Sequence, residues 1–385
     1  MENFEFATTN RIYFGSGSIG RLERIIKNAG EKALIVSVKD QSKVLIIQKA
    51  LEQAQIKSIN LVVSNEPTVE SVHEGLALAR QEKCDLVVGC GGGSVIDTGK
   101  AIAAFLTNPG EILDYLEVIG KGKPIKNRSA PYFAIPTTAG TGAEVTRNAV
   151  LGAPEFQVKV SLRSALMLPV VAIIDPELTV SMSPQVTAST GLDALSQLIE
   201  PYVSNKANSL TDVVCLKGME LVSNSLLRAY QNGNDFNARE EMSLASLFGG
   251  IALANAKLGA VHGFAGPFGG MFSAPHGAVC ARLLPYVMQV NLNALLERDP
   301  ENKATRRYAE IAQILTKDQT ATALDGIKWV YELCEQLNIP PLRIYSFSEY
   351  DFPDLVEKSR VASSMKGNPI ELTQEELRAI LEQAF

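Results

Sequence analysis

Long hydrophobic runs and blocks of one charge are both missing from this sequence of 385 residues. Because no run of about 18 uninterrupted apolar residues occurs, we predict no transmembrane helix. The N-terminal stretch MENFEFATTNRIYFG also lacks the apolar core of a signal peptide. The net charge of −6 is spread along the chain, so nucleic acid and membrane surfaces are poor candidates for its main partner. With 46% hydrophobic and 20% charged residues, the composition is typical of a globular protein, and we expect a cytoplasmic one.

Cysteines are few, odd in number and never spaced as CxxC. This pattern predicts free thiols in a reducing compartment rather than disulfides or a zinc knuckle. Only Cys90 lies beside a glycine run, and packing is the favoured role there. The five cysteines are Cys84, Cys90, Cys215, Cys280 and Cys334.

Hydrophobic patterning divides the chain near the turn-forming stretch DPELTVSMSP. Before it, short apolar runs alternate with helical patterns, which indicates a parallel sheet covered on both faces. After it, helical patterns dominate. We therefore expect an α/β domain over residues 1–180 and an all-helical domain over residues 181–385. The expected strands are 33–38, 58–63, 86–88, 132–135 and 170–174, and the expected helices are 43–54, 69–82, 184–202, 210–230, 239–258, 278–296, 304–315, 321–337 and 373–383.

Two loops in the first half are candidates for binding a nucleotide. In VVGCGGGSVIDTGK a strand leads into glycines and then a helix starting at Ser94, whose N-terminal N–H groups suit a phosphate. The spacing is not GxGxxG, so a tight turn without a ligand is an equal alternative. The second loop, AIPTTAGTGAEVT, offers threonine hydroxyls, although alone it would indicate a polar surface loop. The residues concerned are Gly91, Gly92, Gly93 and Ser94, then Thr137, Thr138 and Thr141.

The sequence has only three histidines, and two of them lie in one glycine-rich stretch. His73 lies in a helical pattern and is expected at the surface. We expect His262 to end one helix and His276 to begin the next, so that a glycine-rich turn points both imidazoles into one cavity. Asp193, on another helix, could join them. Each histidine alone favours a structural role, but together the three side chains predict a metal or acid–base site.

The motifs resemble those of the iron-containing (group III) alcohol dehydrogenases, in the superfamily of dehydroquinate synthase. The similarity runs from IYFGSGSIGRL through GGGSVIDTGKAIA, IPTTAGTGAEVT, KVSLRSALMLPVVAIIDPELT and GLDALSQLIEPYVS into the histidine segment. It implies a Rossmann-like dinucleotide-binding domain, an all-α domain of dehydroquinate synthase type, and an active site between them. It also implies NAD or NADP as cofactor and a divalent metal, Fe(II) or Zn(II). We further expect a small alcohol or aldehyde as substrate, and a homodimer.

By this resemblance each candidate residue acquires an expected role. Residues 91–94 would hold the pyrophosphate, and the three threonines would contact phosphate, ribose or nicotinamide. Lys159 would approach the cofactor and Leu178 would lie near the adenosine. Asp193, His262 and His276 fall on three of the four metal-ligand positions and would also be the catalytic residues.

The sequence departs from the family pattern at three positions. Gln197 stands where the fourth metal ligand would be a histidine, and Gly266 replaces a further histidine found in many members. Val38 aligns where many NAD-preferring members have an aspartate. The absence of this aspartate slightly favours NADP(H), because Ser42 and Lys43 could contact a 2′-phosphate. Asp40 could take the place of the missing aspartate, so the preference is small.

The expected chemistry is hydride transfer between nicotinamide and an alcohol or aldehyde carbon. Two histidines and a carboxylate can hold Fe(II) or Zn(II), which would act as a Lewis acid. An amide oxygen from Gln197 is a weaker donor than imidazole, so the metal would bind less tightly. The alternative is a metal-independent carbonyl reductase in which a histidine donates the proton and Gln197 orients the substrate.

Further expectations concern Glu200, two other possible functions and the lining of the pocket. Glu200 shares the helical face of Asp193 and would make a structural hydrogen bond. A non-redox lyase of dehydroquinate synthase type needs a basic pocket, but residues 240–290 contain only Lys257 and Arg282. A non-catalytic nucleotide-binding protein is the third alternative, against which the retained ligands argue. The apolar residues expected to line the pocket are Val150, Phe156, Phe264, Phe268 and Phe272.

Overall fold

The computed structural model describes residues 3–385, which form two compact units. The α/β unit consists of Ala7–Thr138 and Gly142–Ser181. The helical unit consists of residues 3–6, Ala139–Thr141 and Met182–Phe385. The predicted fold class, an α/β half followed by a helical half, is confirmed.

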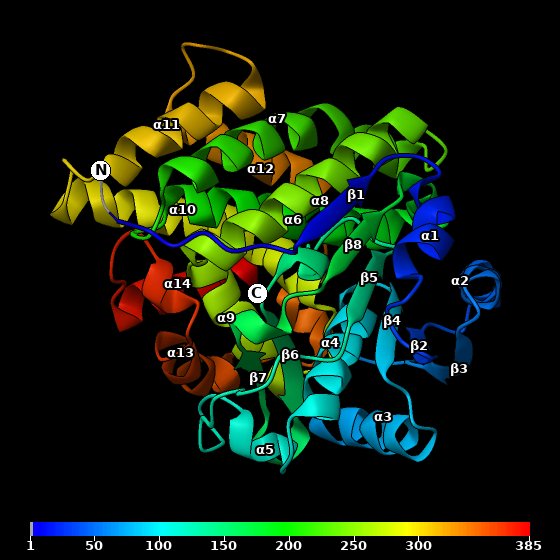
Figure 1. The fold of residues 1–385 in the computed structure, drawn as a ribbon. Helices are drawn as coiled ribbons and strands as arrows, with labels where there is room; N and C mark the ends of the chain where they lie inside the picture. Colours follow the sequence, from blue (N-terminus) through cyan, green and yellow to red (C-terminus); the bar gives the residue numbers. More distant parts are fainter. Residues whose placement is uncertain (1–2) are drawn as a thin grey trace. The chain divides into compact units, whose positions relative to one another are not determined.

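A parallel sheet forms the centre of the α/β unit (Figure 1). Its strand order is β1-β8-β5-β4-β2-β3, and every pair of neighbours is parallel. The five predicted strands are present, whereas β1 was not predicted because its sequence, RIYF, mixes charge with partly buried side chains. The strands are β1 (Arg11–Phe14), β2 (Lys32–Ser37), β3 (Lys57–Val62), β4 (Leu86–Gly91), β5 (Tyr132–Pro136) and β8 (Val171–Ile174).

Helices cover both faces of this sheet. Leu34 and Val36 of β2 belong to one buried cluster with side chains of α3 (Val69–Gln81) and α4 (Gly93–Thr107). Ala33 and Ile35 alternate with them and pack in a second cluster, with α1 (Leu22–Ile26) and α2 (Gln41–Gln53). Because successive side chains of a strand point to opposite faces, burial on both sides produces the continuous apolar runs of the sequence.

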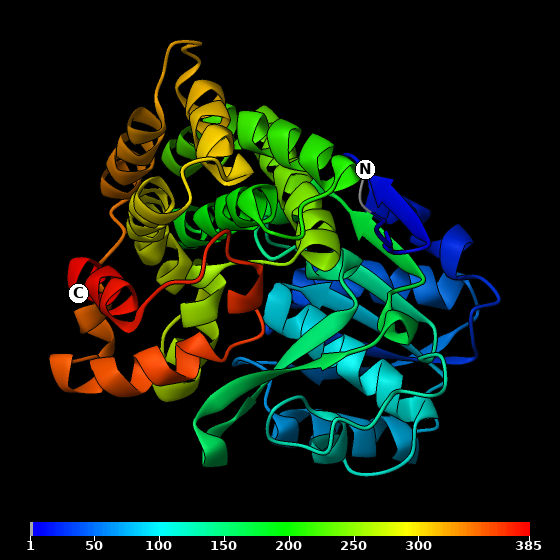
Figure 2. The same cartoon turned by 90° about the vertical axis from the view of Figure 1, so that its left-hand side faces the viewer.

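A two-stranded antiparallel hairpin is the second sheet of the α/β unit (Figure 2). It joins β6 (Asn148–Ala153) to β7 (Val158–Arg163). Gln157 makes the turn possible with a φ of 50°, and Thr68 at the start of α3 bridges to Gly152. The hairpin was not predicted, because alternate residues of β6 are only partly buried and its apolar runs are short. The unit also contains the short helix α5 (Ile112–Tyr115).

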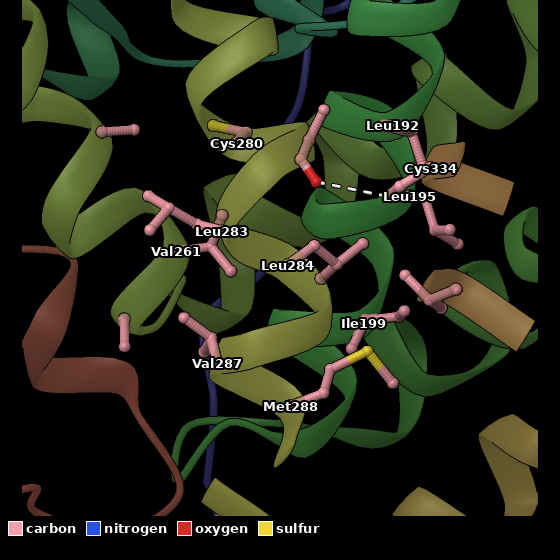
Figure 3. Close-up of a cluster of buried hydrophobic side chains, with 14 of the residues drawn as sticks. Leu192, Leu195, Ile199, Val261, Cys280, Leu283, Leu284, Val287, Met288 and Cys334 are labelled. Atoms are coloured by element: carbon pink, nitrogen blue, oxygen red, sulfur yellow. Dashed lines mark hydrogen bonds between the residues drawn. The ribbon is translucent and has the colours of Figure 1, made fainter. Parts of the chain in front are cut away.

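The helical unit is built around a core that includes α6, α9, α10 and α12 (Figure 3). Leu192, Leu195 and Ile199 of α6 pack there against Leu284 and Met288 of α10. The helices of this unit are α6 (Pro184–Val203), α7 (Ser209–Gln231), α8 (Phe236–Ala256), α9 (Ala260–Met271), α10 (His276–Arg298), α11 (Lys303–Thr316), α12 (Ala323–Gln336), α13 (Phe352–Arg360) and α14 (Gln374–Ala384).

One helix among residues 3–385, α10, is long and apolar enough by itself to cross a membrane. However, 78% of its most apolar window is buried inside the molecule. Helices α8 and α9 pass the same test only when taken together, and they are bent by 97°. Buried core helices of this kind are common, so the apolar character of α10 is explained by its place in the core.

The expectation for the glycine-rich stretch between the histidines was wrong for His262 and is confirmed for His276, which begins α10. His262 does not end a helix: it is the third residue of α9, and most of the predicted turn is helical. The chain instead turns between α8 and α9, where Lys257 has a φ of 62°. At Gly263 a Cβ would lie 2.7 Å from Met365 Cε, so this glycine permits close packing within a helix.

Candidate functional site

Four side chains from three helices converge inside the helical unit. They are Asp193 of α6, His262 of α9, and His276 and Cys280 of α10, and one ligand atom from each lies within 4.8 Å of all the others. Asp193 Oδ1 is 3.3 Å from His262 Nε2 and 3.9 Å from His276 Nε2. The structure therefore brings together the three residues proposed from the sequence. Cys280 was missed, although its spacing of four after His276 puts both on one helical face.

Glu200 determines how the His262 ring is oriented. Its Oε2 lies 2.7 Å from His262 Nδ1, and its Oε1 accepts a hydrogen bond of 2.6 Å from Val261 N–H. A hydrogen on Nδ1, assigned from this contact, leaves Nε2 facing Asp193 Oδ1, 3.3 Å away. Glu200 thus makes a hydrogen bond, as expected, and its partner is a candidate ligand.

Two buried oxygens in this region accept no well-aligned hydrogen bond from the described residues: Asp193 Oδ1 and Gln197 Oε1. Gln197 follows Asp193 by one turn of α6 and packs beside Gly249 of α8, where a Cβ would lie 3.2 Å from Gln197 Cβ. A buried carboxylate oxygen without a donor is costly unless a cation neutralises it. Because imidazole and carboxylate ligands also suit a divalent metal, the residues fit such an ion.

The pKa values of the metal-free cluster reflect the same excess of negative charge. Burial would lower the pKa of His262, but Cys280, Asp193 and Glu200 together raise it well above its usual value. Burial would raise the pKa of Asp193, yet its contacts with the histidines lower it overall. Burial raises the pKa of Cys280 to about 12. A proton on His262 and a metal ion would therefore compete for the same position.

The glycine loop lies where the strand order of the sheet reverses. The chain runs outward from β2 to β3 and then returns to β4 on the other side of β2. Ligands of open parallel sheets bind at the carboxyl ends of the strands next to such a reversal. The segment after β2 lies at this position, and so do Gly91, Gly92 and Gly93, which lead from the last residue of β4 to the first residue of α4.

Helix α4 begins one residue earlier than predicted. Gly92 is the N-cap with extended backbone, so Ser94, where the helix was expected to start, is its second residue. At Gly91 a Cβ would lie 2.5 Å from a methyl group of Val95, which explains why glycine is needed there. No described side chain caps the helix, so its first N–H groups suit an anion.

The other expected nucleotide contacts fall in different places. Thr137 N–H donates to Gly91 O at 3.0 Å, and Thr138 side-chain atoms lie 3.4 Å from where a Cβ of Gly92 would be. These two threonines therefore adjoin the glycine loop. Thr141 belongs to the helical unit, Lys159 on β7 forms an ion pair with Glu66, and Leu178 is buried in the cluster that contains Ile35.

Comparisons with known proteins agree with these motifs over nearly the whole chain. Residues 9–176 match the model of the iron-containing alcohol dehydrogenase family, and residues 187–385 match its C-terminal model. The chain belongs to the iron-containing alcohol dehydrogenase family.

Alcohol dehydrogenase 4 of Saccharomyces cerevisiae is 35% identical over 382 residues, covering 97% of this chain and 96% of the yeast protein. 1,3-Propanediol dehydrogenase of Klebsiella pneumoniae is 34% identical over 395 residues and 99% of each chain. The crystal structure of a 1,3-propanediol oxidoreductase covers 100% of each chain with a TM-score of 0.92 and 33% identity.

Membership of the iron-containing alcohol dehydrogenases confirms the predicted activity class. The protein is an NAD(P)-dependent oxidoreductase that acts on the CH–OH group of alcohols and on the corresponding aldehydes. The family uses NAD(P) and iron, and the helical unit supplies a cluster able to hold the metal. The non-redox and non-catalytic alternatives are excluded.

A buried lysine supports the α/β unit of this iron-containing alcohol dehydrogenase. Lys100 of α4 is completely buried, and its Nζ donates to Ala143 O at 2.7 Å, Thr146 Oγ1 at 2.9 Å and Asn148 O at 2.7 Å. It also lies 3.5 Å from Asp97 Oδ1. Lys100 thereby fixes the segment between the threonine loop and β6 to the helix that follows the glycine loop.

The expected apolar lining of the pocket needs correction. Phe264 and Phe268 are fully buried within the helical core, so they cannot face an open pocket. Phe268 packs instead against Phe272 and Phe347, with distances of 4.9 Å and 5.1 Å between the ring centroids. Phe156 is 46% exposed in the hairpin turn. The error arose because glycine spacing suggested a loop where a packed helix forms.

Proposed function

We propose that this protein interconverts small apolar aldehydes and primary alcohols with the help of a divalent metal and with NADP(H) favoured over NAD(H). The observation that carries the metal-assisted form is the buried Asp193 Oδ1, which accepts no well-aligned hydrogen bond and lies 3.3 Å and 3.9 Å from the Nε2 atoms of His262 and His276. We also propose that it works as a cytoplasmic homodimer with a functional division at residue 180.

Asp193, His262 and His276 are the proposed metal ligands and catalytic residues. When bound, Fe(II) or Zn(II) supplies Lewis-acid polarisation of the substrate oxygen. Glu200 fixes the His262 ring through Nδ1 and so keeps Nε2 directed at the cluster. Gln197 offers a neutral oxygen, placed on the same face of α6 as Asp193, that can bind the metal or orient the substrate.

The proposed nucleotide contacts follow the carboxyl ends of β4 and β5. Residues 91–94 and the N-terminus of α4 would hold the pyrophosphate, with Thr137, Thr138 and Thr141 on phosphate, ribose or nicotinamide. Lys159, on β7 of the hairpin, and Leu178, in the buried cluster that contains Ile35, would also contact the cofactor.

The preference for NADP(H) rests on the end of β2, where Val38 follows the strand. Asp40, the nearest carboxylate, caps α2 by accepting from Ser42 N–H at 3.0 Å and Ser42 Oγ–H at 2.7 Å. Both hydrogen bonds hold the Asp40 carboxylate at the N-terminus of α2. Lys43, in the first turn of the same helix, supplies a positive charge for a 2′-phosphate.

The test follows absorbance at the nicotinamide band with a panel of aldehydes, using NADPH and NADH in parallel. We expect oxidation of NADPH, loss of activity after exhaustive chelation, and recovery when Fe(II) or Zn(II) is added. The variant His276→Ala should abolish this recovery, whereas His73→Ala, at an exposed position of α3, should not. Full activity after chelation would instead support the metal-independent reductase, with a histidine as proton donor.

A further inference from the structure

The thiol of Cys280 lies inside the proposed metal cluster. Its Sγ is 3.6 Å from His276 Nε2 and 3.8 Å from His262 Nε2, and the side chain is fully buried. Figure 3 shows Cys280 on the same helix as Leu283, Leu284 and Val287, whose side chains fill the core. Cys280 therefore borders both the apolar core and the cluster of histidines.

The spacing of the four side chains matches the donor set of a small tetrahedral ion. With metal–nitrogen and metal–oxygen bonds of about 2.0–2.1 Å and a metal–sulfur bond of about 2.3 Å, neighbouring N and O donors lie about 3.3 Å apart, and N and S donors about 3.6 Å apart. Asp193 Oδ1 and His262 Nε2 are 3.3 Å apart, and Cys280 Sγ and His276 Nε2 are 3.6 Å apart. Two more of the six pairs, Cys280 Sγ to His262 Nε2 at 3.8 Å and Asp193 Oδ1 to His276 Nε2 at 3.9 Å, are longer, and the remaining two pairs lie within 4.8 Å.

We propose that Cys280 is a metal ligand in this protein and supplies the fourth strong donor at a centre where Gln197 replaces a histidine. This inference rests on the proposed metal-assisted function and goes beyond it, because neither the resemblance nor the sequence pattern gives Cys280 a role. The buried Asp193 Oδ1, which accepts no well-aligned hydrogen bond although His262 Nε2 lies 3.3 Å away, is the independent sign that a cation fits the cluster.

The chemistry of the thiol gives this proposal a consequence for metal choice. On binding, the S–H bond is lost, a metal–sulfur bond forms, and one proton leaves to solvent. A set of one thiolate, two imidazoles and one carboxylate is softer than one with a third imidazole in place of the thiolate. Softer sets favour Zn(II) over Fe(II), so we expect zinc to bind in preference to iron.

Cobalt(II) tests the assignment directly, because only a cobalt–thiolate bond produces a strong sulfur-to-metal charge-transfer band in the near ultraviolet. Titration of the metal-free protein with Co(II) should produce this band, together with the visible bands of bound cobalt. Cys280→Ser and Cys280→Ala should lose the charge-transfer band, and zinc affinity should fall by about 100-fold or more, beyond the 10–100-fold typical of residues outside the ligand set. Gln197→Ala should retain the band.

Cys334→Ala is the matched control, since Cys334 is a buried thiol of the same core whose Sγ donates to Ala281 O at 3.4 Å. This variant should keep the band. Visible cobalt bands without charge transfer in the unmodified protein would overturn the role of Cys280 and leave the metal centre standing. If cobalt and zinc do not bind at all, the proposed metal-assisted function fails as well.

Discussion

Replacing the buried Lys100 by methionine should destabilise the protein more than most single substitutions do. Methionine has nearly the same length, so little cavity results, but the ammonium group and its hydrogen bonds disappear. Asp97 Oδ1 then loses the charge 3.5 Å away, while Asp97 Oδ2 still accepts from Val150 N–H at 2.9 Å. The perturbation therefore leaves the Asp97 carboxylate of α4, whose side chain is only 14% exposed, without its counter-charge.

The expected loss in free energy of unfolding is about 3–5 kcal/mol, the usual result of removing one partner of a buried ion pair. The lost bonds to the carbonyls of Ala143 and Asn148 are replaced only in part, because the single Thr146 Oγ–H, 3.1 Å from the first and 3.4 Å from the second, can donate to one of them at a time. Natural proteins are stable by about 5–15 kcal/mol, so the loss should be a large fraction of the total.

The destabilisation should grow with pH. Burial raises the pKa of Asp97 and Lys100 opposes that rise, so the variant should have a still higher folded-state pKa. A carboxyl whose folded pKa exceeds its unfolded value of about 3.9 loses stability as pH rises from the unfolded pKa to the folded one. The difference between the parent protein and K100M should therefore be larger at pH 8 than at pH 5.

Urea unfolding followed by circular dichroism measures these differences. Lys49→Met, at an exposed position of α2, is the matched control and should change stability by no more than about 0.5 kcal/mol. The double variant K100M/D97N should lose less than the sum of the two single variants, because both charges are then absent. A loss below about 1 kcal/mol for K100M, or strict additivity in the double variant, would refute the reasoning.

Two further predictions concern buried carboxylates. Burial raises the pKa of Glu144 to about 7, so between pH 4.5 and 7 the folded state binds more protons than the unfolded state and stability falls with rising pH. Glu144→Gln should flatten this decline, by about 3 kcal/mol across the window, in urea unfolding at several pH values; an unchanged slope would contradict the assignment. Glu200→Gln should weaken zinc binding by about 10–100-fold, since Glu200 fixes the ring of His262, and competition with a chromogenic chelator would show it. Glu297→Gln, at an exposed position of α10, should bind zinc as the parent does, and equal affinity of both variants would rule out this role of Glu200.

The sequence predicted the sheet and most of the helices because these elements have strong local patterns. The strand from Lys32 to Ser37 is buried on both faces and therefore forms a continuous apolar run. Elements whose conformation depends on distant partners were missed. The hairpin of β6 and β7 is partly exposed, and α9 is rich in glycines that tight packing makes acceptable.

The residues of the candidate site likewise include some that the sequence predicted and some that it did not. Asp193, His262 and His276 could be proposed from residue type and resemblance, and they do lie together, while their role as ligands stays a prediction. The pairing of Glu200 with His262 joins two helices far apart in the sequence, so no local spacing reveals it. Nothing in the sequence indicated that Cys280 lies near His262, because the local pattern of α10 does not show which other helix packs against this face.

The pairing of the first strand has a consequence for synthesis. Arg11 of β1 pairs with Val171 of β8, so the strand made first has its neighbour made last in the sheet. At about 5–20 residues per second, the ribosome needs roughly ten to thirty seconds to make the chain between them. Until then β1 has no partner strand, and the sheet of the α/β unit cannot be completed. The nascent chain therefore carries an unpaired strand, of a kind that can promote aggregation, until the residues between β1 and β8 have been made.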